Sequence, residues 1–146
     1  MKRIRFLLSC CLLLCSACAL AESYAIVTLN KALPKLKSSQ VKMIYRGHVS
    51  HIDNVNIVLL DLTQGSALRN RFYYTLLGKS PAQMQAIWAR QTFSGRNRAP
   101  SEVAENNPQS VTNWLNHNKN GIAYIPVSWL REELSVLYVF DSEEPL

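Results

Sequence analysis

The sequence predicts one α/β domain. Three observations lead to this fold class. Apolar runs typical of strands alternate with segments of helical periodicity along the chain. No internal repeat or low-complexity segment interrupts them. Residues 22–146, which follow an N-terminal leader, are about 125 in number, enough for one sound core.

The first 21 residues resemble a cleaved secretory signal. Lys2, Arg3 and Arg5 form a basic start, and residues 6–20 are apolar or small. This run is shorter than the roughly 20 residues that a membrane span needs. We therefore expect cleavage after Ala21, a domain over 22–146 without a membrane span, and export to the periplasm. The alternative is an uncleaved N-terminal anchor.

All four cysteines lie in this leader: Cys10, Cys11, Cys15 and Cys18. After cleavage at Ala21 the remaining chain has no cysteine, so no disulfide is expected. The residues "CSAC" ending at Cys18 loosely resemble a lipoprotein cleavage site. Lipid anchoring at Cys18 is therefore a second possibility for the N-terminus.

The charge distribution predicts one basic face. Removal of the leader lowers the formal net charge from +6 to +3, too little to indicate nucleic-acid binding. Residues 62–101 contain no acidic side chain, whereas residues 141–146 form an acidic tail that we expect to be flexible. A solvated basic face is the plainest interpretation of this pattern.

The first half of the domain is predicted as strand, short helix and strand. Residues 24–29 form a β-rich run, and Pro34 marks 30–38 as a connection. Ser39 can cap a short helix that Gly47 ends. Residues 48–54 are predicted as a polar loop, and 55–62 as a buried strand because the run is almost wholly apolar.

Three helix starts follow in the second half. Ser66 is a good N-cap for a helix that ends at Gly78, with an apolar face of Leu68, Phe72, Tyr73, Leu76 and Leu77. Ser80, Pro81 and Gln83 predict a capping box, with Met84, Ile87 and Trp88 as the buried stripe. Residues 94–102 read as loop, and 107–118 as a helix with Val111, Trp114 and Leu115 inward. Residues 121–127 and 134–140 are predicted strands, and Pro126 should end the first.

The strongest candidate site is the junction from Gly65 to Arg69. A strand, a small-residue turn and a helix start place free backbone N–H groups where negative charge is favoured. Arg69 would be the third helical residue, where its charge costs up to about 1 kcal/mol unless an anion lies beside it. The predicted oxyanion ligands are Gly65, Ser66, Ala67, Leu68 and Arg69. The alternative is that Ser66 merely caps the helix and Arg69 points into solvent.

Other candidate residues give weaker signals. Gln64, Arg71, Arg96 and Arg98 are possible supporting residues for the anion; the last two lie in the loop "FSGRNRAP". The scattered His48, His51 and His117 lack the spacing of a metal site. No acid–base pair or nucleotide motif stands out, so we expect no metal, no cofactor and no enzyme activity. The aromatic residues fall on helical faces and are expected in the core.

The sequence segments described above, taken in order, resemble those of a known protein family. "QVKMIYRG", a strand, "QGSALRNRFY", "GKSP", "FSG" and "GIAY" are similar to short periplasmic proteins related to the phosphate-binding components of ABC transporters. The resemblance covers about residues 24–140. It implies a single lobe of periplasmic-binding-protein type II architecture, with a mixed sheet flanked by helices. In the full-length relatives, two such lobes hold phosphate in the cleft between them.

Compared with the family's motif, the chain departs from the pattern. Ser66 matches the serine of a Ser-Gly-Thr anion turn, with Ala67 and Leu68 at the next two positions and Phe72 at the aromatic that follows. The family's preceding Arg and Asp positions hold Leu62 and Gln64, and Ala123 replaces a glycine. The chain is also about half as long as a two-lobed protein.

Two functional hypotheses follow from the resemblance and these departures. In the first, the protein is a non-enzymatic periplasmic module that binds phosphate or a similar oxyanion, and its expected partner is a second chain or a transporter component. In the second, the fold has lost its small ligand and acts as an envelope interaction protein.

Overall fold

The computed structural model describes residues 22–141. The predicted signal peptide at 1–21, the alternative lipid anchor at Cys18 and residues 142–146 of the acidic tail lie outside the described residues. In chain order, the elements are β1 (Tyr24–Thr28), α2 (Ser38–Tyr45), β2 (His51–Ile52), β3 (Val55–Asn56), β4 (Val58–Asp61), α3 (Ala67–Leu77), α4 (Pro81–Phe93), β5 (Ser101–Glu102), α5 (Pro108–His117), β6 (Gly121–Pro126), the short 3₁₀ helix η1 (Val127–Trp129) and β7 (Ser135–Phe140).

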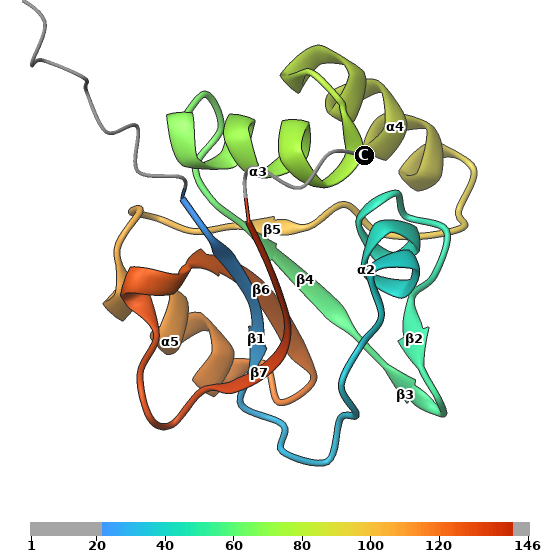
Figure 1. Cartoon of the computed structure of the whole chain (residues 1–146). Coiled ribbons are helices and arrows are strands. Elements are labelled where there is room, and N and C mark those ends of the chain that lie inside the picture. Colours follow the sequence, from blue (N-terminus) through green and yellow to red (C-terminus); the bar gives the residue numbers. More distant parts are fainter. Residues whose placement is uncertain (1–21, 142–146) are drawn as a thin grey trace, which may run out of the picture.

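A mixed sheet organises the domain, in the order β5-β4-β6-β1-β7. β4 runs parallel to both β5 and β6, whereas β1 is antiparallel to β6 and β7. The carboxyl ends of β4 and β5 therefore meet at one edge of the sheet, and α3 begins just after this edge (Figure 1). In α/β sheets, ligands typically bind at the carboxyl ends of the parallel strands.

Helices cover both faces of the central strands. Every residue of β1 and β6 is buried, which requires cover on each side. In Figure 1, α5 lies beside β6 and β1, whereas α3 and α4 lie together at the opposite end of the view. The start of β6 packs so closely on α5 that a Cβ on Gly121 would lie 2.5 Å from the Trp114 ring. This explains why the strand begins with glycine.

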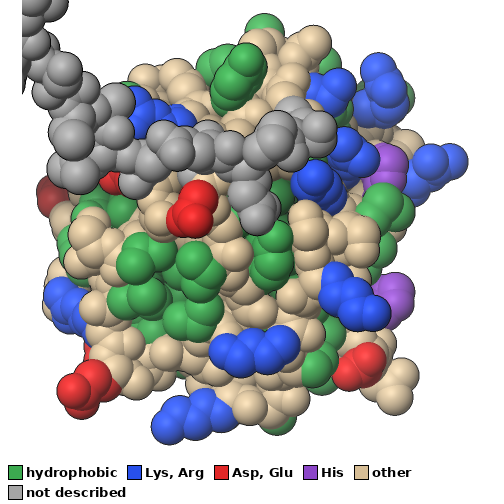
Figure 2. Space-filling view, viewed as in Figure 1, with side chains coloured by type: hydrophobic (Ala, Val, Ile, Leu, Met, Phe, Trp, Pro, Cys, Tyr) green, Lys and Arg blue, Asp and Glu red, His purple; other side chains and the backbone are tan. Residues whose placement is uncertain are grey.

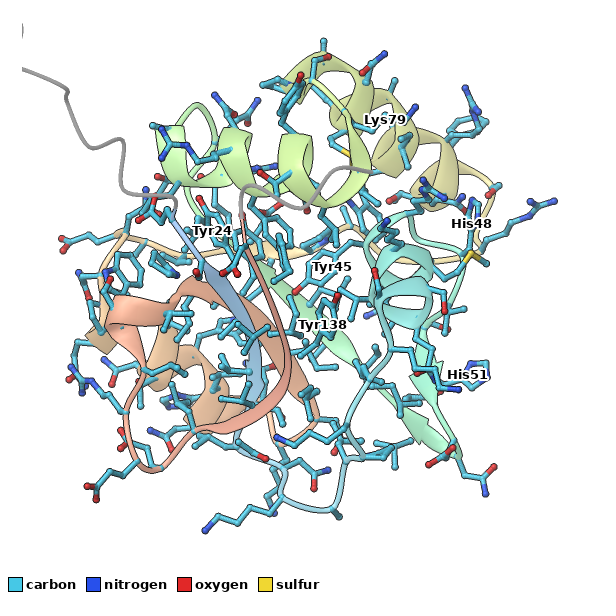
Figure 3. The ribbon with its side chains drawn as sticks, viewed as in Figure 1. Tyr24, Tyr45, His48, His51, Lys79 and Tyr138 are labelled. Atoms are coloured by element: carbon cyan, nitrogen blue, oxygen red, sulfur yellow. The ribbon has the colours of Figure 1, made fainter. Side chains whose placement is uncertain are left out.

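An aromatic cluster fills the other face. Phe72 of α3 stacks on Tyr124 of β6 with ring centroids 3.5 Å apart, and Tyr24, Tyr45 and Tyr73 pack edge-on around them. Such pairs stabilise by about 0.5–1.5 kcal/mol beyond their buried area. Figure 3 shows Tyr24 and Tyr45 within the molecule, and His48 and His51 at its periphery. The cluster fixes α3 on the sheet, and with it the predicted site.

The predicted helix ends are largely confirmed. Ser66 accepts a hydrogen bond from the Arg69 N–H, and Gly78 ends α3 in the left-handed conformation. Ser80 and Gln83 form the predicted capping box of α4, with Pro81 at its first position. These features depend on nearest neighbours in sequence, which is why they could be predicted.

Two predictions of local structure were wrong in detail. The 48–54 loop contains β2, which pairs with β3 in a hairpin whose turn places Asp53 at φ 50°, so the predicted 55–62 strand divides into β3 and β4. The predicted 94–102 loop ends in β5, which pairs with β4. In addition, α2 begins one residue before the predicted cap Ser39, because the Gln40 side chain accepts the Lys37 N–H at 2.8 Å.

Candidate functional site

The turn between β4 and α3 holds the site. Gly65 has φ +79°, a conformation that other residues adopt only with strain, and no other atom crowds its position. The Ser66 hydroxyl accepts the Arg69 N–H at 3.3 Å, so Ser66 is the cap of the helix. Among the described residues, the N–H groups of Ala67 and Leu68 have no hydrogen-bond partner. The helix therefore begins with free donors at this edge of the sheet.

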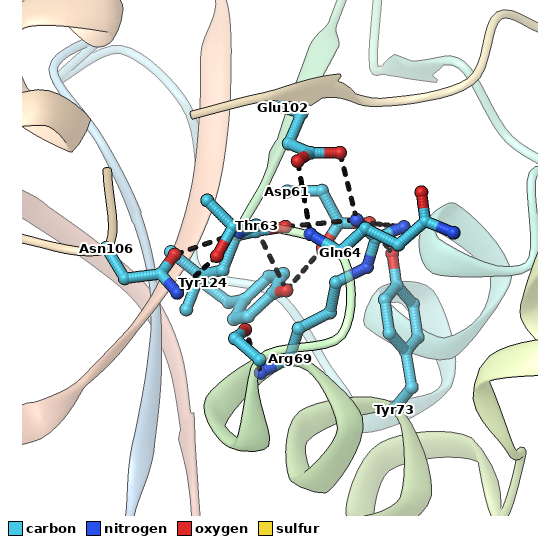
Figure 4. Close-up of polar contacts among 10 residues, drawn as sticks. Asp61, Thr63, Gln64, Arg69, Tyr73, Glu102, Asn106 and Tyr124 are labelled. Atoms are coloured by element: carbon cyan, nitrogen blue, oxygen red, sulfur yellow. Dashed lines mark hydrogen bonds and ion pairs between the residues drawn. The ribbon is translucent and has the colours of Figure 1, made fainter. Parts of the chain in front are cut away.

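Arg69 is paired with carboxylates of the chain itself. Its Nη2 lies 3.2 Å from Asp61 Oδ2, and its Nη1 donates to the Leu62 carbonyl at 3.0 Å. The same Nη1 lies 3.5 Å from Glu102 Oε2 (Figure 4). The Arg69 side chain is 21% exposed, so it does not point freely into solvent. An anion does lie beside Arg69, and it is supplied by the ends of β4 and β5.

Asp61 is the buried centre of this network. Its side chain is 3% exposed, and its carboxylate accepts hydrogen bonds from the hydroxyls of Tyr73, at 2.9 Å, and Tyr124. Burial raises the pKa of Asp61, while Arg69 and the two hydroxyls oppose that rise. Burial and the Asp61 charge raise the pKa of Tyr73 and of Tyr124 well above the usual value. Both hydroxyls therefore remain protonated donors at neutral pH.

Glu102 closes the site from β5. Asp61 and Glu102 are direct neighbours in the parallel pairing of β4 and β5. Glu102 Oε1 accepts the Gln64 N–H at 3.1 Å, while Oε2 faces Arg69. Its side chain is 47% exposed, so this carboxylate is held only loosely. Glu102 thus supplies an oxyanion group between a backbone donor of the turn and the arginine.

A second pair of polar groups fixes the turn. The Thr63 N–H donates to Asn106 Oδ1 at 2.9 Å, and the Asn106 amide donates back to the Thr63 hydroxyl. Asn107 then caps α5 by accepting the Ser110 N–H at 2.8 Å. The segment that follows β5 therefore holds the 62–66 turn in place through the Thr63 N–H and hydroxyl, and it leaves the N–H groups of Ala67 and Leu68 unoccupied.

A cleft of about 570 Å³ opens at this network. It lies between α3, α4 and the segment that leads into β5. Asp61, Gln64, Gly65, Arg69 and Glu102 line its polar end. A ligand in this cleft would meet the Gln64–Arg69 turn directly.

The structure separates the predicted site residues into three groups. The first lines the cleft; the second, which does not line it, belongs to α3 and its cap: Ser66, Ala67, Leu68 and Arg71. Gln64, Gly65 and Arg69 line the cleft; Ser66 caps the helix, and the Leu68 carbonyl accepts the Tyr24 hydroxyl at 3.1 Å. Arg71 is an exposed residue whose guanidinium lies 3.5 Å from Glu22.

Arg96 and Arg98 form the third group. They line a different cleft, of about 880 Å³, beside β4 and the end of α5. This cleft shares Thr92 and Ala99 with the cleft at Arg69, and a supporting role of the two arginines for an anion at Arg69 stays a prediction.

Sequence reasoning missed the residues that hold Arg69. The resemblance had suggested that the turn lacks an aspartate, because Gln64 stands at the expected position. Asp61 lies three positions earlier, at the strand end, and points its carboxylate at Arg69. An acidic residue at the end of an otherwise apolar buried run was a usable signal. No local signal indicated Glu102, because its place depends on the pairing of β4 with β5.

Solved structures confirm the fold class. No family model and no curated protein matches the sequence. The chain is similar to a putative phosphate ABC transporter substrate-binding protein with bound phosphate from Clostridium perfringens, at 20% identity and a TM-score of 0.59 over 80% of this chain. It is also similar to an ABC-type phosphate transport receptor from Vibrio cholerae, at 16% identity and a TM-score of 0.58 over 80% of this chain.

These similarities show the fold and not the ligand, because both identities are low. The chain matches 44% and 45% of the two neighbours' own lengths, so it corresponds to less than half of each. Within residues 22–141, no helix has the length and apolar character needed to cross a membrane. The resemblance to phosphate-binding proteins is thus confirmed as a resemblance of architecture.

Proposed function

We propose that the protein is a non-enzymatic binding module of the periplasmic-binding-protein type, which takes phosphate or a similar oxyanion at the Gln64–Arg69 turn. The observation that supports the proposal is the position of Glu102. Its carboxylate already bonds the Gln64 N–H and faces Arg69, so a chain carboxylate stands where the ligand would bind. The solved neighbours are phosphate-binding proteins of the same fold, which favours this class of ligand.

Anion binding requires the Glu102 side chain to rotate away from the Gln64 N–H and Arg69. With Glu102 in place, one guanidinium faces two carboxylates, and a further anion would be repelled. Because Glu102 is half exposed, rotation of one side chain vacates the position at little cost. The ligand would then accept hydrogen bonds from the Gln64 N–H, from the free Ala67 and Leu68 N–H groups of α3, and from Nη1 of Arg69. Asp61 would keep the guanidinium oriented.

The competition between Glu102 and the ligand can be measured. Phosphate and sulfate are titrated calorimetrically into the purified protein and into Glu102→Ala. Removal of the competing carboxylate should tighten binding about tenfold, the equivalent of one charge-assisted contact. Glu105→Ala is the matched control, since it removes the same charge from an exposed side chain that, within residues 22–141, forms a hydrogen bond only with Asn107.

A second pair of variants tests the arginine. Arg69→Ala should abolish anion binding, whereas Arg71→Ala, two positions along the same helix, should leave it unchanged. Thermal melts verify that Arg69→Ala remains folded. Absence of binding at millimolar anion in both the wild type and Glu102→Ala would refute the proposed function.

The alternative function is that of an envelope interaction protein without a small ligand. Arg69 already pairs with Asp61, Glu102 and the Leu62 carbonyl, which favours a structural role for that residue. In Figure 2, several Lys and Arg side chains gather on the side of the molecule where the histidines lie. Arg96 and Arg98 line one cleft with Val49 and Ser50, which lie between the two histidines His48 and His51 in sequence. In this alternative, the basic surface at Arg96 and Arg98 binds an acidic protein or a second copy. Cross-linking in the periplasm, compared between wild type and Arg96→Ala/Arg98→Ala, tests it: loss of a cross-linked partner in the double variant supports this alternative.

A further inference from the structure

The cleft beside Arg69 has an apolar end that a bare oxyanion would not use. Beyond the polar residues near Arg69, α4 lines it with Ala89 and Phe93 at the surface and the buried Met84 and Trp88 beneath them. Pro100 and the polar Gln85 and Thr92 also line this part of the cleft. The apolar residues from α4 lie on successive turns of the helix, so the apolar lining extends along α4. One continuous cleft therefore joins the anion position to an apolar surface.

The size of the cleft indicates an organic ligand. At about 570 Å³ it falls among pockets that bind small organic molecules, roughly 300–1,000 Å³. An ion of four or five heavy atoms would occupy only the Arg69 end. Phe93 lines the cleft and is 98% exposed, so its ring packs on no described part of the chain. A ligand with an apolar body would cover this ring and gain by removing it from water.

The charge of the site indicates the head group. The group that occupies the position is the singly charged, planar carboxylate of Glu102. The buried carboxyl group of Asp61 lies on the other side of the same guanidinium, so each added negative charge on a ligand meets repulsion. A monoanion that copies the Glu102 carboxylate fits better than a doubly charged phosphate.

We infer that the cleft binds a small organic carboxylate, with its carboxylate in the place of Glu102 and its apolar body against Ala89, Phe93 and Pro100. The inference rests on the proposed oxyanion site and specifies its ligand class. It differs from inorganic phosphate binding in one measurable respect: affinity should increase with the apolar surface attached to the anion.

The test compares ligands that share a head group. Acetate and phenylacetate are titrated into the protein and into Glu102→Ala, followed by NMR shifts of the Gln64 and Arg69 amides; inorganic phosphate and phenyl phosphate form a second pair. Burial of one phenyl ring should make phenylacetate about 10- to 100-fold tighter than acetate. Phenylacetate should also bind more tightly than phenyl phosphate.

A matched pair of variants locates the ring. Ala89 lines the cleft and Ala86, on the same helix, does not; both are exposed. Ala89→Phe fills the apolar end and should weaken phenylacetate at least tenfold while sparing acetate. Ala86→Phe adds the same side chain outside the cleft and should leave both ligands unchanged.

Each outcome separates this inference from the proposed function. If acetate or phosphate binds through Arg69 but phenylacetate gains nothing, the inference is wrong and the oxyanion site stands. Equal effects of Ala89→Phe and Ala86→Phe also overturn the inference. If none of the four anions binds to either form of the protein, the oxyanion site itself is refuted.

Discussion

Three buried tyrosines of the aromatic cluster differ in the hydrogen bonds that their hydroxyls make. This difference predicts that Tyr→Phe lowers the free energy of unfolding at two of these positions and raises it at the third. The Tyr124 hydroxyl donates to Asp61 and accepts the Leu62 N–H at 3.2 Å, and the Tyr73 hydroxyl donates to Asp61 at 2.9 Å. The Tyr45 hydroxyl is fully buried and has no partner among the described residues. Tyr→Phe keeps the ring and its packing, so each variant isolates one hydroxyl.

The magnitudes follow from these contacts. Tyr124→Phe removes a hydrogen bond to a carboxylate and leaves the Leu62 N–H unpaired, so the free energy of unfolding should fall by about 3 kcal/mol. Tyr73→Phe loses only its bond to Asp61, and the fall should be about 2 kcal/mol. Tyr45→Phe removes an unpaired buried hydroxyl, so the free energy of unfolding should rise by about 1 kcal/mol.

Urea unfolding followed by circular dichroism measures all three variants. The m-value should stay constant, because the rings bury the same surface. A Tyr45→Phe variant that is destabilised as much as Tyr124→Phe would refute the reasoning, since it would show that the Tyr45 hydroxyl is bonded in the folded protein.

Two further predictions concern the glycines and the response to alkali. Gly47→Ala should lower the free energy of unfolding by about 3 kcal/mol, since φ is +73° and the new Cβ would lie 2.9 Å from the Trp88 ring. Gly65→Ala should lower it by only about 1 kcal/mol, because φ is +79° but no other residue has an atom within 4 Å of the new Cβ. Urea midpoints of the two variants test this order, and equal losses would contradict it. Burial raises the pKa of Tyr24 to about 12, so the stability that this residue contributes is complete below its ordinary pKa of 10.0 and falls as pH rises toward about 12. The urea midpoint should therefore decrease over that interval, and less steeply in Tyr24→Phe; identical pH profiles would contradict the assignment.

The predicted parts of the site are those set by neighbours in sequence. The cap at Ser66, the glycine turn before it and the third helical position of Arg69 all follow from residues within one helical turn. The predicted oxyanion ligand stays a prediction. A cation at a helix start is disfavoured without a nearby anion, and in the structure the carboxylates of Asp61 and Glu102 lie beside Arg69. The identity of that anion was not predictable in the same way. Two chain carboxylates fill the position, and one of them comes from a different strand.

The sequence by itself determined the α/β class, the helix starts and ends, and the basic turn that attracts an anion, because these depend on propensity, capping and periodicity over a few residues. Only the tertiary structure decided what surrounds Arg69. The parallel pairing of β4 with β5 sets Glu102 beside Asp61, and the packing of α3 against β6 directs two tyrosine hydroxyls at Asp61. The same packing leaves a cleft between α3 and α4 and sends Arg96 and Arg98 to another one. Contacts between residues far apart in the chain carry no local signature, so this part of the site appears only once the sheet is assembled.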